Sequence, residues 1–328
     1  MRRTIFRAIL LALTLCAGPL ASAGAAAYPE RPIHVIVPYA GAGTTDIASR
    51  ILFDRIARTI GQPIVIENRP GAGGNIGLDQ AAKAQPDGYT LVVADPMTSF
   101  SANVTLLPSL GFNPLKDFVP VANFGSTGAA IIVAPSLPAR TLAEFVALAK
   151  RRPGQLLYGS TGVGSPGHLN GEVFARLVGI EAVHVPYRNG GQGTTDLLAG
   201  RIHFWIAQIP TRLDQVRSGK LRALAVAGSE RSPDLPDVPT VREAGFGDFD
   251  ASSDYAVFAP AGTPREAIDK LHAEIRAALQ DPSLVAKLKA AGLEPKLMDS
   301  AQVTKVLQDQ IARWADVIKA AHISVTGQ

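Results

Sequence analysis

Two glycine-rich turns in the chain have the composition of an anion-binding site. The first follows Val37-Pro38-Tyr39 and reads Gly41-Ala-Gly-Thr-Thr-Asp46, and the second follows Val185-Pro186-Tyr187 and reads Gly191-Gln-Gly-Thr-Thr-Asp196. Glycine permits a tight turn, and Thr or Asp is typical of a helix start, so each turn could simply begin its own helix. Alternatively, each turn presents helix amides at the carboxyl edge of a sheet, and the two together hold a small anion.

Other patterns that could carry chemistry are weaker. Gly162-Val-Gly-Ser-Pro-Gly167 has the spacing of a dinucleotide-binding turn, but Arg188 follows the next strand where an acid for the ribose is expected. Ser165 lacks the first glycine of a hydrolase nucleophile elbow. We expect His184 to pack on its strand, whereas His168 opens a helix and could face a ligand. No two histidines have metal-binding spacing, so we predict neither a metal nor a cofactor.

Strands and helices alternate along the chain. Short apolar, mostly β-branched runs predict strands at 33–37, 63–67, 89–93, 130–133, 156–158, 182–185 and 221–226. Helical spacing of apolar residues follows the first of these runs. Strands separated by helices predict parallel sheets in an α/β protein.

Several helix boundaries carry their own signals. Thr141 with Glu144, and Thr263 with Glu266, have the spacing of capping boxes. Asp281-Pro282 predicts a further helix start, Gly292 its end, and 301–321 a long C-terminal helix. Asp46 and Asp196 could be taken for a catalytic carboxylate pair, but we expect both to cap helices instead.

The N-terminal residues have the pattern of a secretory signal. Arg2, Arg3 and Arg7 precede an apolar run over 8–17, and small residues follow at 21–27. The run is shorter than the roughly 20 residues that a membrane span needs, which favours a signal cleaved near residue 27. Cleavage there removes Cys16, the only cysteine, and so excludes disulfides and thiol chemistry from the mature chain.

The composition is that of a globular protein with two lobes or one large domain. The chain has 328 residues, of which 47% are hydrophobic and 18% charged. A net charge of +4 would suggest an acidic polymer as partner, but three of the positive charges lie in the predicted signal and no acid does. Because the remainder is nearly neutral, we expect no nucleic-acid or membrane-surface partner.

Short motifs in a fixed order cover nearly all of the chain after residue 27. They are Tyr28-Pro-Glu-Arg-Pro-Ile33, Glu67-Asn-Arg-Pro-Gly-Ala-Gly-Gly-Asn-Ile-Gly77, Pro86-Asp-Gly-Tyr-Thr90, His184-Val-Pro-Tyr187, Leu235-Pro-Asp-Val-Pro-Thr240 and Ala259-Pro-Ala-Gly-Thr-Pro264. They resemble the substrate-binding proteins of tripartite tricarboxylate transporters, called Bug proteins in Bordetella. The resemblance implies the two-lobed type II periplasmic binding protein fold, or Venus flytrap, with parallel-rich sheets, flanking helices and a two-stranded hinge.

The family organisation implies that the chain crosses twice between lobes. Lobe 1 is then 28–127 with 253–328, and lobe 2 is 128–252. The resemblance also implies a monomeric, non-enzymatic protein of the periplasm that captures a small organic carboxylate and delivers it to an inner-membrane permease pair. A role as the ligand-sensing partner of a sensor kinase is the alternative, and a secreted hydrolase acting through Ser165 and His168 is a third.

The resemblance places ligand contacts on loops of both lobes, made by amides, hydroxyls and waters instead of an arginine clamp. In lobe 1 the matching residues are Tyr39, Ala40, Gly43, Thr44, Thr45, Asp46, Met97, Thr98, Ser99 and Asn103. In lobe 2 they are Thr161, Gly162, Ser165, His168, Tyr187, Thr194, Asp196 and Gln208. Direct side-chain contacts are expected from Thr44, Thr45, Thr161, Ser165 and Thr194, although some of these could only cap their helices.

Two departures from the family pattern bear on the ligand. The family commonly has Phe-Asp-Asn where this chain has Trp205-Ile-Ala-Gln208, and often has a histidine near Phe100. The carboxylate that could meet a ligand ammonium is therefore absent. This predicts a di- or tricarboxylate, or an aromatic carboxylate, that lacks an α-amino group. Trp205 and Phe100 could simply be core aromatics.

Overall fold

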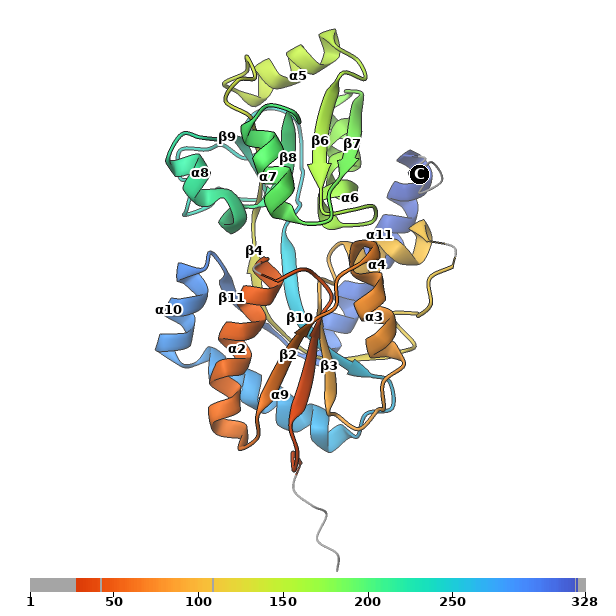
Figure 1. Ribbon diagram of the computed structural model, residues 1–328. Helices are drawn as coiled ribbons and strands as arrows, with labels where there is room; N and C mark the ends of the chain where they lie inside the picture. The colour runs from red at the N-terminus through yellow and green to blue at the C-terminus, as the bar shows by residue number, and fades with distance from the viewer. Residues whose placement is uncertain (1–27, 42, 108, 322, 324–328) are drawn as a thin grey trace, which may run out of the picture.

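The structure is a computed structural model and describes residues 28–41, 43–107, 109–321 and 323. The predicted export signal, 1–27, lies outside the described residues. The described chain forms two α/β lobes, one above the other in Figure 1, each built on its own sheet. No helix in these ranges is long and apolar enough to cross a membrane.

The first lobe contains a six-stranded mixed sheet in the order β11-β4-β10-β3-β1-β2. Its strands are β1 (Ile33–Val37), β2 (Ile64–Asn68), β3 (Thr90–Ala94), β4 (Phe118–Thr127), β10 (Ser253–Pro260) and β11 (Glu294–Met298). Strand β1 pairs parallel with β2 and β3, as predicted, but β10 is antiparallel to β3 and β4, and β11 to β4. Strand β10 enters from the second lobe at the edge where β4 leaves, so the two strands run in opposite directions.

The second lobe contains a five-stranded mixed sheet in the order β7-β6-β8-β5-β9. Its strands are β5 (Ala129–Val133), β6 (Leu156–Ser160), β7 (Ala182–Pro186), β8 (Phe204–Gln208) and β9 (Arg222–Ala227). Strand β6 is parallel to β7 and β8, whereas β5 is antiparallel to β8 and β9. The carboxyl ends of β6 and β8 therefore lie at the edge where β5 enters from the first lobe.

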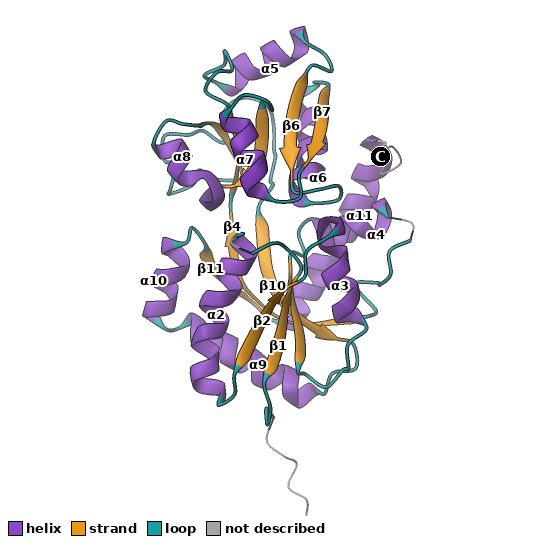
Figure 2. Cartoon of the chain, in the orientation of Figure 1, coloured by secondary structure: helices purple, strands orange, loops and turns teal. Residues whose placement is uncertain are grey.

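Helices cover both faces of each sheet (Figure 2). In the first lobe they are α2 (Thr44–Ile60), η1 (Ala72–Gly74), α3 (Asn75–Ala82), α4 (Ser99–Leu106), α9 (Arg265–Leu279), α10 (Pro282–Ala290) and α11 (Ser300–Ala321). In the second they are α5 (Leu142–Arg151), α6 (Pro166–Val178), α7 (Gly190–Leu198), η2 (Ile209–Arg212) and α8 (Leu213–Arg217). Successive strand residues face opposite sides, so Ile131 packs under α5 and α6 while Ile132 packs under α7.

Most of the predicted helix boundaries are confirmed. The Thr141 hydroxyl accepts the Glu144 amide proton at 3.1 Å, and the Asp281 carboxylate accepts that of Ser283 at 2.9 Å. Gly292 follows α10 with a φ of 73°, a conformation that favours glycine. The capping box predicted at Thr263 is wrong, because its hydroxyl donates to the Pro260 carbonyl and α9 begins only after Pro264.

Two chain segments join the lobes, and they lie side by side. Gly128 connects β4 to β5, and Ser253, the first residue of β10, pairs with Thr127, the last of β4. The Gln208 side-chain amide at the end of β8 donates to the Ser253 hydroxyl at 3.1 Å. The two sheets are therefore connected by two adjacent chain segments, and the hydrogen bond between Gln208 and Ser253 stabilises this connection.

An apolar cluster away from these segments also joins the lobes. Leu169 of α6 packs against Ala102 and Leu106 of α4 and against Trp314 and Ile318 of α11. Figure 1 shows the C-terminal end of α11 rising beside the second lobe. This contact holds the two lobes against each other in the structure described.

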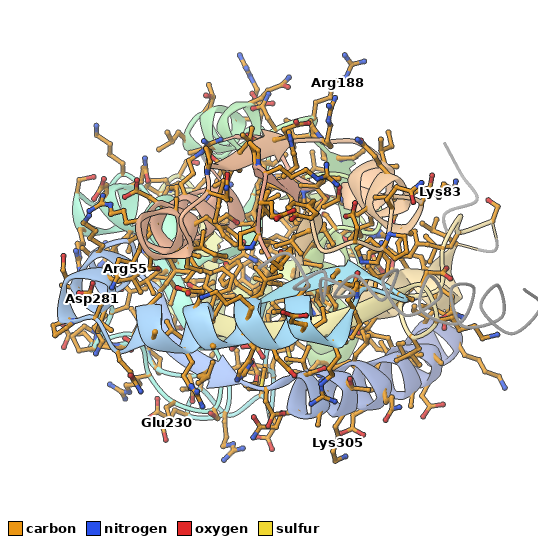
Figure 3. All side chains as sticks on the ribbon, turned by 90° about the horizontal axis from the view of Figure 1, so that it is seen from below. Arg55, Lys83, Arg188, Glu230, Asp281 and Lys305 are labelled. Carbon is orange, nitrogen blue, oxygen red and sulfur yellow. The ribbon has the colours of Figure 1, made fainter. Side chains whose placement is uncertain are left out.

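The six charged side chains labelled in Figure 3 lie on the periphery. Arg55 of α2 and Asp281 before α10 form an ion pair with an Nε to Oδ2 distance of 2.6 Å, which ties two helices of the first lobe together. Arg188 is exposed and points away from the molecule.

Candidate functional site

The loop from β1 to α2 places a helix start at the upper edge of the first lobe. Thr44 begins α2 and is buried, and the N-cap, Gly43, offers no side chain to bond the first amides. The Thr44 hydroxyl lies near that of Tyr255 but makes no hydrogen bond of ordinary geometry with a described residue. Polar donors at this helix start are therefore left for another partner.

Asp46 does not cap α2, contrary to expectation. Its carboxylate lies within the first turn and accepts hydrogen bonds from Arg50 Nε and Asn68 Nδ2, both at 3.0 Å. The side chain ties α2 to the end of β2 and helps to hold the loop that precedes the helix.

The second glycine-rich turn does not match the first in structure. Asn189 caps α7 by accepting the Gln192 amide proton at 2.9 Å, so the helix begins one turn earlier than the sequence similarity suggests. Thr194 then lies inside the helix, where its hydroxyl donates to the Gly190 carbonyl. The helix start in this turn is therefore at Gly190, and the Gln192 amide there is bonded to Asn189.

Asp196 also lies inside α7 and is not a cap. Its carboxylate accepts the Tyr187 hydroxyl proton at 2.9 Å and pairs with Arg201 at 2.8 Å. These two bonds hold the pKa of Asp196 below its ordinary value. Burial and the neighbouring carboxylate raise the pKa of Tyr187 to about 12. Tyr187 and Asp196 thus bond each other.

The loop from β3 to α4 brings a second uncapped helix start to the same edge. Thr98 precedes α4, is buried, and makes no side-chain cap. Asn103, on the first turns of α4, is fully buried and donates from Nδ2 to Asn75 Oδ1 at 3.2 Å, but its own Oδ1 has no partner in the described chain. The Met97 carbonyl accepts from the Trp314 indole at 2.9 Å, and Ser99 begins the helix.

The loop from β6 to α6 provides the facing helix start in the second lobe. Ser165 is the N-cap and is fully buried, yet its hydroxyl makes no capping bond and no other hydrogen bond within the described ranges. The Gly164 amide donates to His168 Nδ1 at 3.2 Å. Thr161 is exposed, and Gly162 has a φ of 119°.

The two histidines of this region are neutral. Burial lowers the pKa of His168 to about 4 and that of His184, whose ring centroid is 4.1 Å away, to about 3. His184 Nε2 lies 2.5 Å from Ser160 Oγ, so it packs beneath the loop as expected. His168 is buried as well, and its lowered pKa makes it a weak base near neutral pH, because burial disfavours the protonated ring.

Loops of the two lobes meet at these helix starts. A β-carbon at Gly73 of η1 would lie 2.7 Å from the Val163 carbonyl oxygen, and one at Gly164 would lie 2.8 Å from Asn103 Oδ1. The backbone of η1 and the side chain of Asn103 therefore touch the loop that precedes α6. Tyr39, in turn, packs against Gly74.

Asp95 lies directly after β3 at the same edge and was not predicted. Its Oδ1 accepts amide protons from Met97 at 2.9 Å and Asp254 at 3.3 Å, and its Oδ2 makes no hydrogen bond of ordinary geometry with a described residue. Burial raises the pKa of Asp95 to about 7, and the Asp254 carboxylate adds to this rise. Asp254 is paired with Lys296 at 3.0 Å.

Two further residues were missed at the sequence level. Asn75 supports Asn103, and Arg212 lies buried at the end of η2 after Gln208. Phe100 and Trp205 are core aromatics: Phe100 packs in a cluster of phenylalanines, and Trp205 lies under α7. Position at the carboxyl end of a strand was the available signal for Asp95.

The described residues contain no group of three His, Cys, Asp or Glu side chains placed to hold a metal ion. A surface hollow of about 490 Å³ lies between the end of β5 and α5, and one of about 200 Å³ lies beside the Arg55–Asp281 pair. Neither reaches the buried polar groups at the facing edges of the lobes. Those groups, together with the uncapped starts of α2, α4 and α6, form the candidate site.

Comparison with known proteins identifies the family. The model of the tripartite tricarboxylate transporter family receptor matches residues 48–323. The chain is also 37% identical to protein BugT of Bordetella pertussis, over 97% of this chain and 98% of that protein. The chain belongs to this receptor family. It is therefore a two-lobed solute-binding protein and not an enzyme.

Two solved structures of related proteins hold carboxylates. The R. palustris protein Rpa4515 with adipate is 34% identical, with a TM-score of 0.85, over 90% of this chain and 99% of that one. MatC from Rhodopseudomonas palustris with bound malate is 33% identical, with a TM-score of 0.82, over 89% of this chain and all of the other. Two proteins similar to this chain in sequence and fold thus hold small organic carboxylates.

Proposed function

We propose that this receptor captures a small organic carboxylate between its lobes in the periplasm and delivers it to a membrane permease pair of the tripartite tricarboxylate type. Residues 1–27 would direct export and be removed. The lobes would be 28–127 with 253–328, and 128–252, moving about the paired segments at Gly128 and Ser253. Family membership and the carboxylates bound by two relatives support this proposal.

The observation that carries the proposal is a set of unsatisfied polar groups shared by both lobes. Thr44 and Asn103 of the first lobe and Ser165 of the second each bury an oxygen that makes no hydrogen bond of ordinary geometry in the described structure. Buried polar atoms are normally hydrogen-bonded, so these three unpaired oxygens indicate a missing hydrogen-bond partner. A solute carboxylate and its waters would supply that partner.

The helix starts supply complementary charge. The starts of α5, α7 and α10 are bonded by Thr141, Asn189 and Asp281, whereas α2, α4 and α6 have no side-chain cap. Amide groups at an uncapped helix start favour an anion through their N–H bonds and the helix dipole. A carboxylate bridging α2 or α4 to α6 would favour the closed arrangement by contacts made only there.

The site favours a solute without an ammonium group. Asp46 and Asp196 are occupied by basic side chains, and Asp95 is about half protonated near pH 7 because burial raises its pKa to about 7. No predicted contact residue therefore offers an unpaired carboxylate to an amino group. We infer that di- and tricarboxylates or aromatic carboxylates bind in preference to aspartate or glutamate.

Calorimetric titration of protein stripped of ligand by unfolding and refolding tests the proposal. The panel is succinate, adipate, malate, citrate, nicotinate, aspartate and glutamate. We expect one or more of the non-amino carboxylates to bind in the micromolar range or tighter. Binding of the amino acids alone, or of nothing in the panel, would contradict the proposal.

Two N-cap variants separate binding from stability. Ser165→Ala removes a hydroxyl that makes no protein hydrogen bond, so it should lower solute affinity by about 1–2 kcal/mol and leave the unfolding temperature nearly unchanged. Thr141→Ala removes a working cap far from the site and should cost about 1 kcal/mol of stability with unchanged affinity. If Ser165→Ala lowered stability and left solute affinity unchanged, while Thr141→Ala lowered affinity, Ser165 would not belong to the site.

A further inference from the structure

Arg212 is a buried cation that forms no ion pair with a described residue. The residue is only 4% exposed, at the end of η2, the turn whose Pro210 lies against Gly292 of the first lobe. Burial alone lowers the pKa of Arg212, to about 10, and no nearby carboxylate raises it. The guanidinium is therefore charged at neutral pH and lacks the acidic partner that a buried charge normally has.

The free donors of Arg212 have the geometry of a carboxylate site. Nη1 donates to the Thr211 hydroxyl at 2.8 Å, while Nε and Nη2 have no hydrogen-bond partner in the described parts of the chain. Nε and Nη2 lie on one edge of the planar group and point their N–H bonds in parallel. This pair matches the two oxygens of one carboxylate, a geometry that lysine cannot reproduce.

Trp205 fixes the position of the guanidinium. The Arg212 guanidinium carbon lies 4.3 Å from the Trp205 ring centroid, and the Tyr187 ring stacks on the same indole at 5.9 Å. A β-carbon at Gly193 or Gly159 would lie only 2.1 or 2.4 Å from the indole, so the absence of side chains there gives the ring its place. Because the closely packed Trp205 ring holds the stacked Arg212 guanidinium in place, the guanidinium is preorganised for its ligand.

The same indole connects Arg212 to the start of α6. Trp205 Nε1 lies 3.3 Å from the position of a β-carbon at Gly167, in the first turn of that helix. The start of α6, with Ser165 and its uncapped amides, thus lies at one edge of the Trp205 indole. Arg212 lies over the face of the same indole. Two anion-attracting groups lie on one aromatic support, in the same lobe.

We propose that Arg212 binds a second anionic group of the solute through Nε and Nη2, while the helix starts hold the first. This rests on the proposed function and deepens it, because it makes the solute a dianion whose second carboxylate this arginine recognises. A monocarboxylate of equal chain length would leave Arg212 unpaired. Specificity for the dianion then follows from the cost of that buried, unpaired charge.

The test compares dicarboxylates of three to eight carbons, malate and adipate among them, with monocarboxylates of the same length by calorimetry. Arg212→Met keeps apolar packing on Trp205 and removes the charge, and Arg212→Lys keeps the charge and removes the paired donors. Arg313→Met is the matched control, because Arg313 lies over Trp314 with its guanidinium carbon 5.9 Å from the ring centroid and is itself exposed on α11. Unfolding temperatures of all variants without ligand report whether each folds.

We expect Arg212→Met and Arg212→Lys to lower the affinity of the preferred dicarboxylate at least tenfold, with monocarboxylate affinity changed less than twofold and Arg313→Met like the wild type. Arg212→Met should also unfold at an equal or higher temperature without ligand, since it removes an unpaired buried charge. Equal losses for both ligand classes, or no loss for the dicarboxylate, would overturn the inference alone. If no dicarboxylate binds the wild type, the inference fails, and the proposed function fails with it only if monocarboxylates and citrate also do not bind.

Discussion

Ionisation of Asp95 should make the stability of this receptor fall as the pH rises. Asp95 is buried beside Asp254, and its pKa is raised from 3.8 to about 7. Between these values the folded protein holds a proton that the unfolded chain has released. The contribution is therefore fully present below about pH 4 and is lost as the pH rises through about 7.

The size of the effect follows from the shift. At about 1.4 kcal/mol for each pKa unit, a rise of about three units corresponds to roughly 4 kcal/mol, of which more than half falls between pH 5 and 8. Asp95→Asn keeps an oxygen to accept the Met97 and Asp254 amide protons and removes the ionisation. Its stability should lack this part of the pH dependence.

Urea unfolding of both proteins at pH 5, 6, 7 and 8, in buffers without carboxylates, measures the difference. The free energy of unfolding of Asp95→Asn relative to the wild type should increase by about 2–3 kcal/mol from pH 5 to 8. Asp309→Asn, at an exposed acid of α11, is the control and should show no such trend. A difference that does not change with pH would refute the reasoning about Asp95.

Further substitutions test packing and lobe contact. Gly171→Ala should destabilise the protein by about 1–3 kcal/mol in thermal or urea unfolding, because the new methyl would lie 2.2 Å from Cε2 of buried Tyr158; wild-type stability would contradict this. Leu169→Ala should weaken the apolar contact between the lobes, enlarge the radius of gyration of the ligand-free protein in solution scattering and lower solute affinity. Leu177→Ala on the same helix removes a side chain that is 40% exposed and should change neither quantity. Equal effects of the two leucine variants would argue against a role of this cluster in closure.

Local signals in the sequence predicted the elements whose stability is local. The strands at β1, β2 and β3 were found within one residue, and the caps at Thr141 and Asp281 were correct. Strands β4 and β10 were missed because Ala, Gly, Asn and Pro interrupt their apolar runs. Both strands are paired with neighbours on both sides in the sheet. This pairing stabilises them although their own residues have a weak preference for a strand.

The second glycine-rich turn shows how a repeated motif misleads. Thr194 and Asp196 match Thr44 and Asp46 in sequence, but Asn189 begins α7 a turn earlier and places them inside the helix. The cap itself was readable, because Asn189 precedes the amide it bonds by three residues. The two turns are similar in amino-acid composition, but α7 begins where its N-cap, Asn189, lies.

The electrostatic features of the site required the tertiary structure. Asp95 acquires its raised pKa from burial and from Asp254, which is far away in the sequence. Arg212 has no motif, and only the folded chain shows that two of its nitrogens are buried without a partner. Ser165 was predicted from the family resemblance, but its lack of a capping bond could not be read from the residue type.

A crystal structure of the receptor with the carboxylate that binds it most tightly would test the central claim most directly. The account predicts one solute between the lobes, with a carboxylate oxygen within hydrogen-bonding distance of the Ser165 hydroxyl and of amides at the start of α2, α4 or α6. A solute bound outside the interlobe contact, or one held between the lobes without any contact to these helix starts, would contradict it.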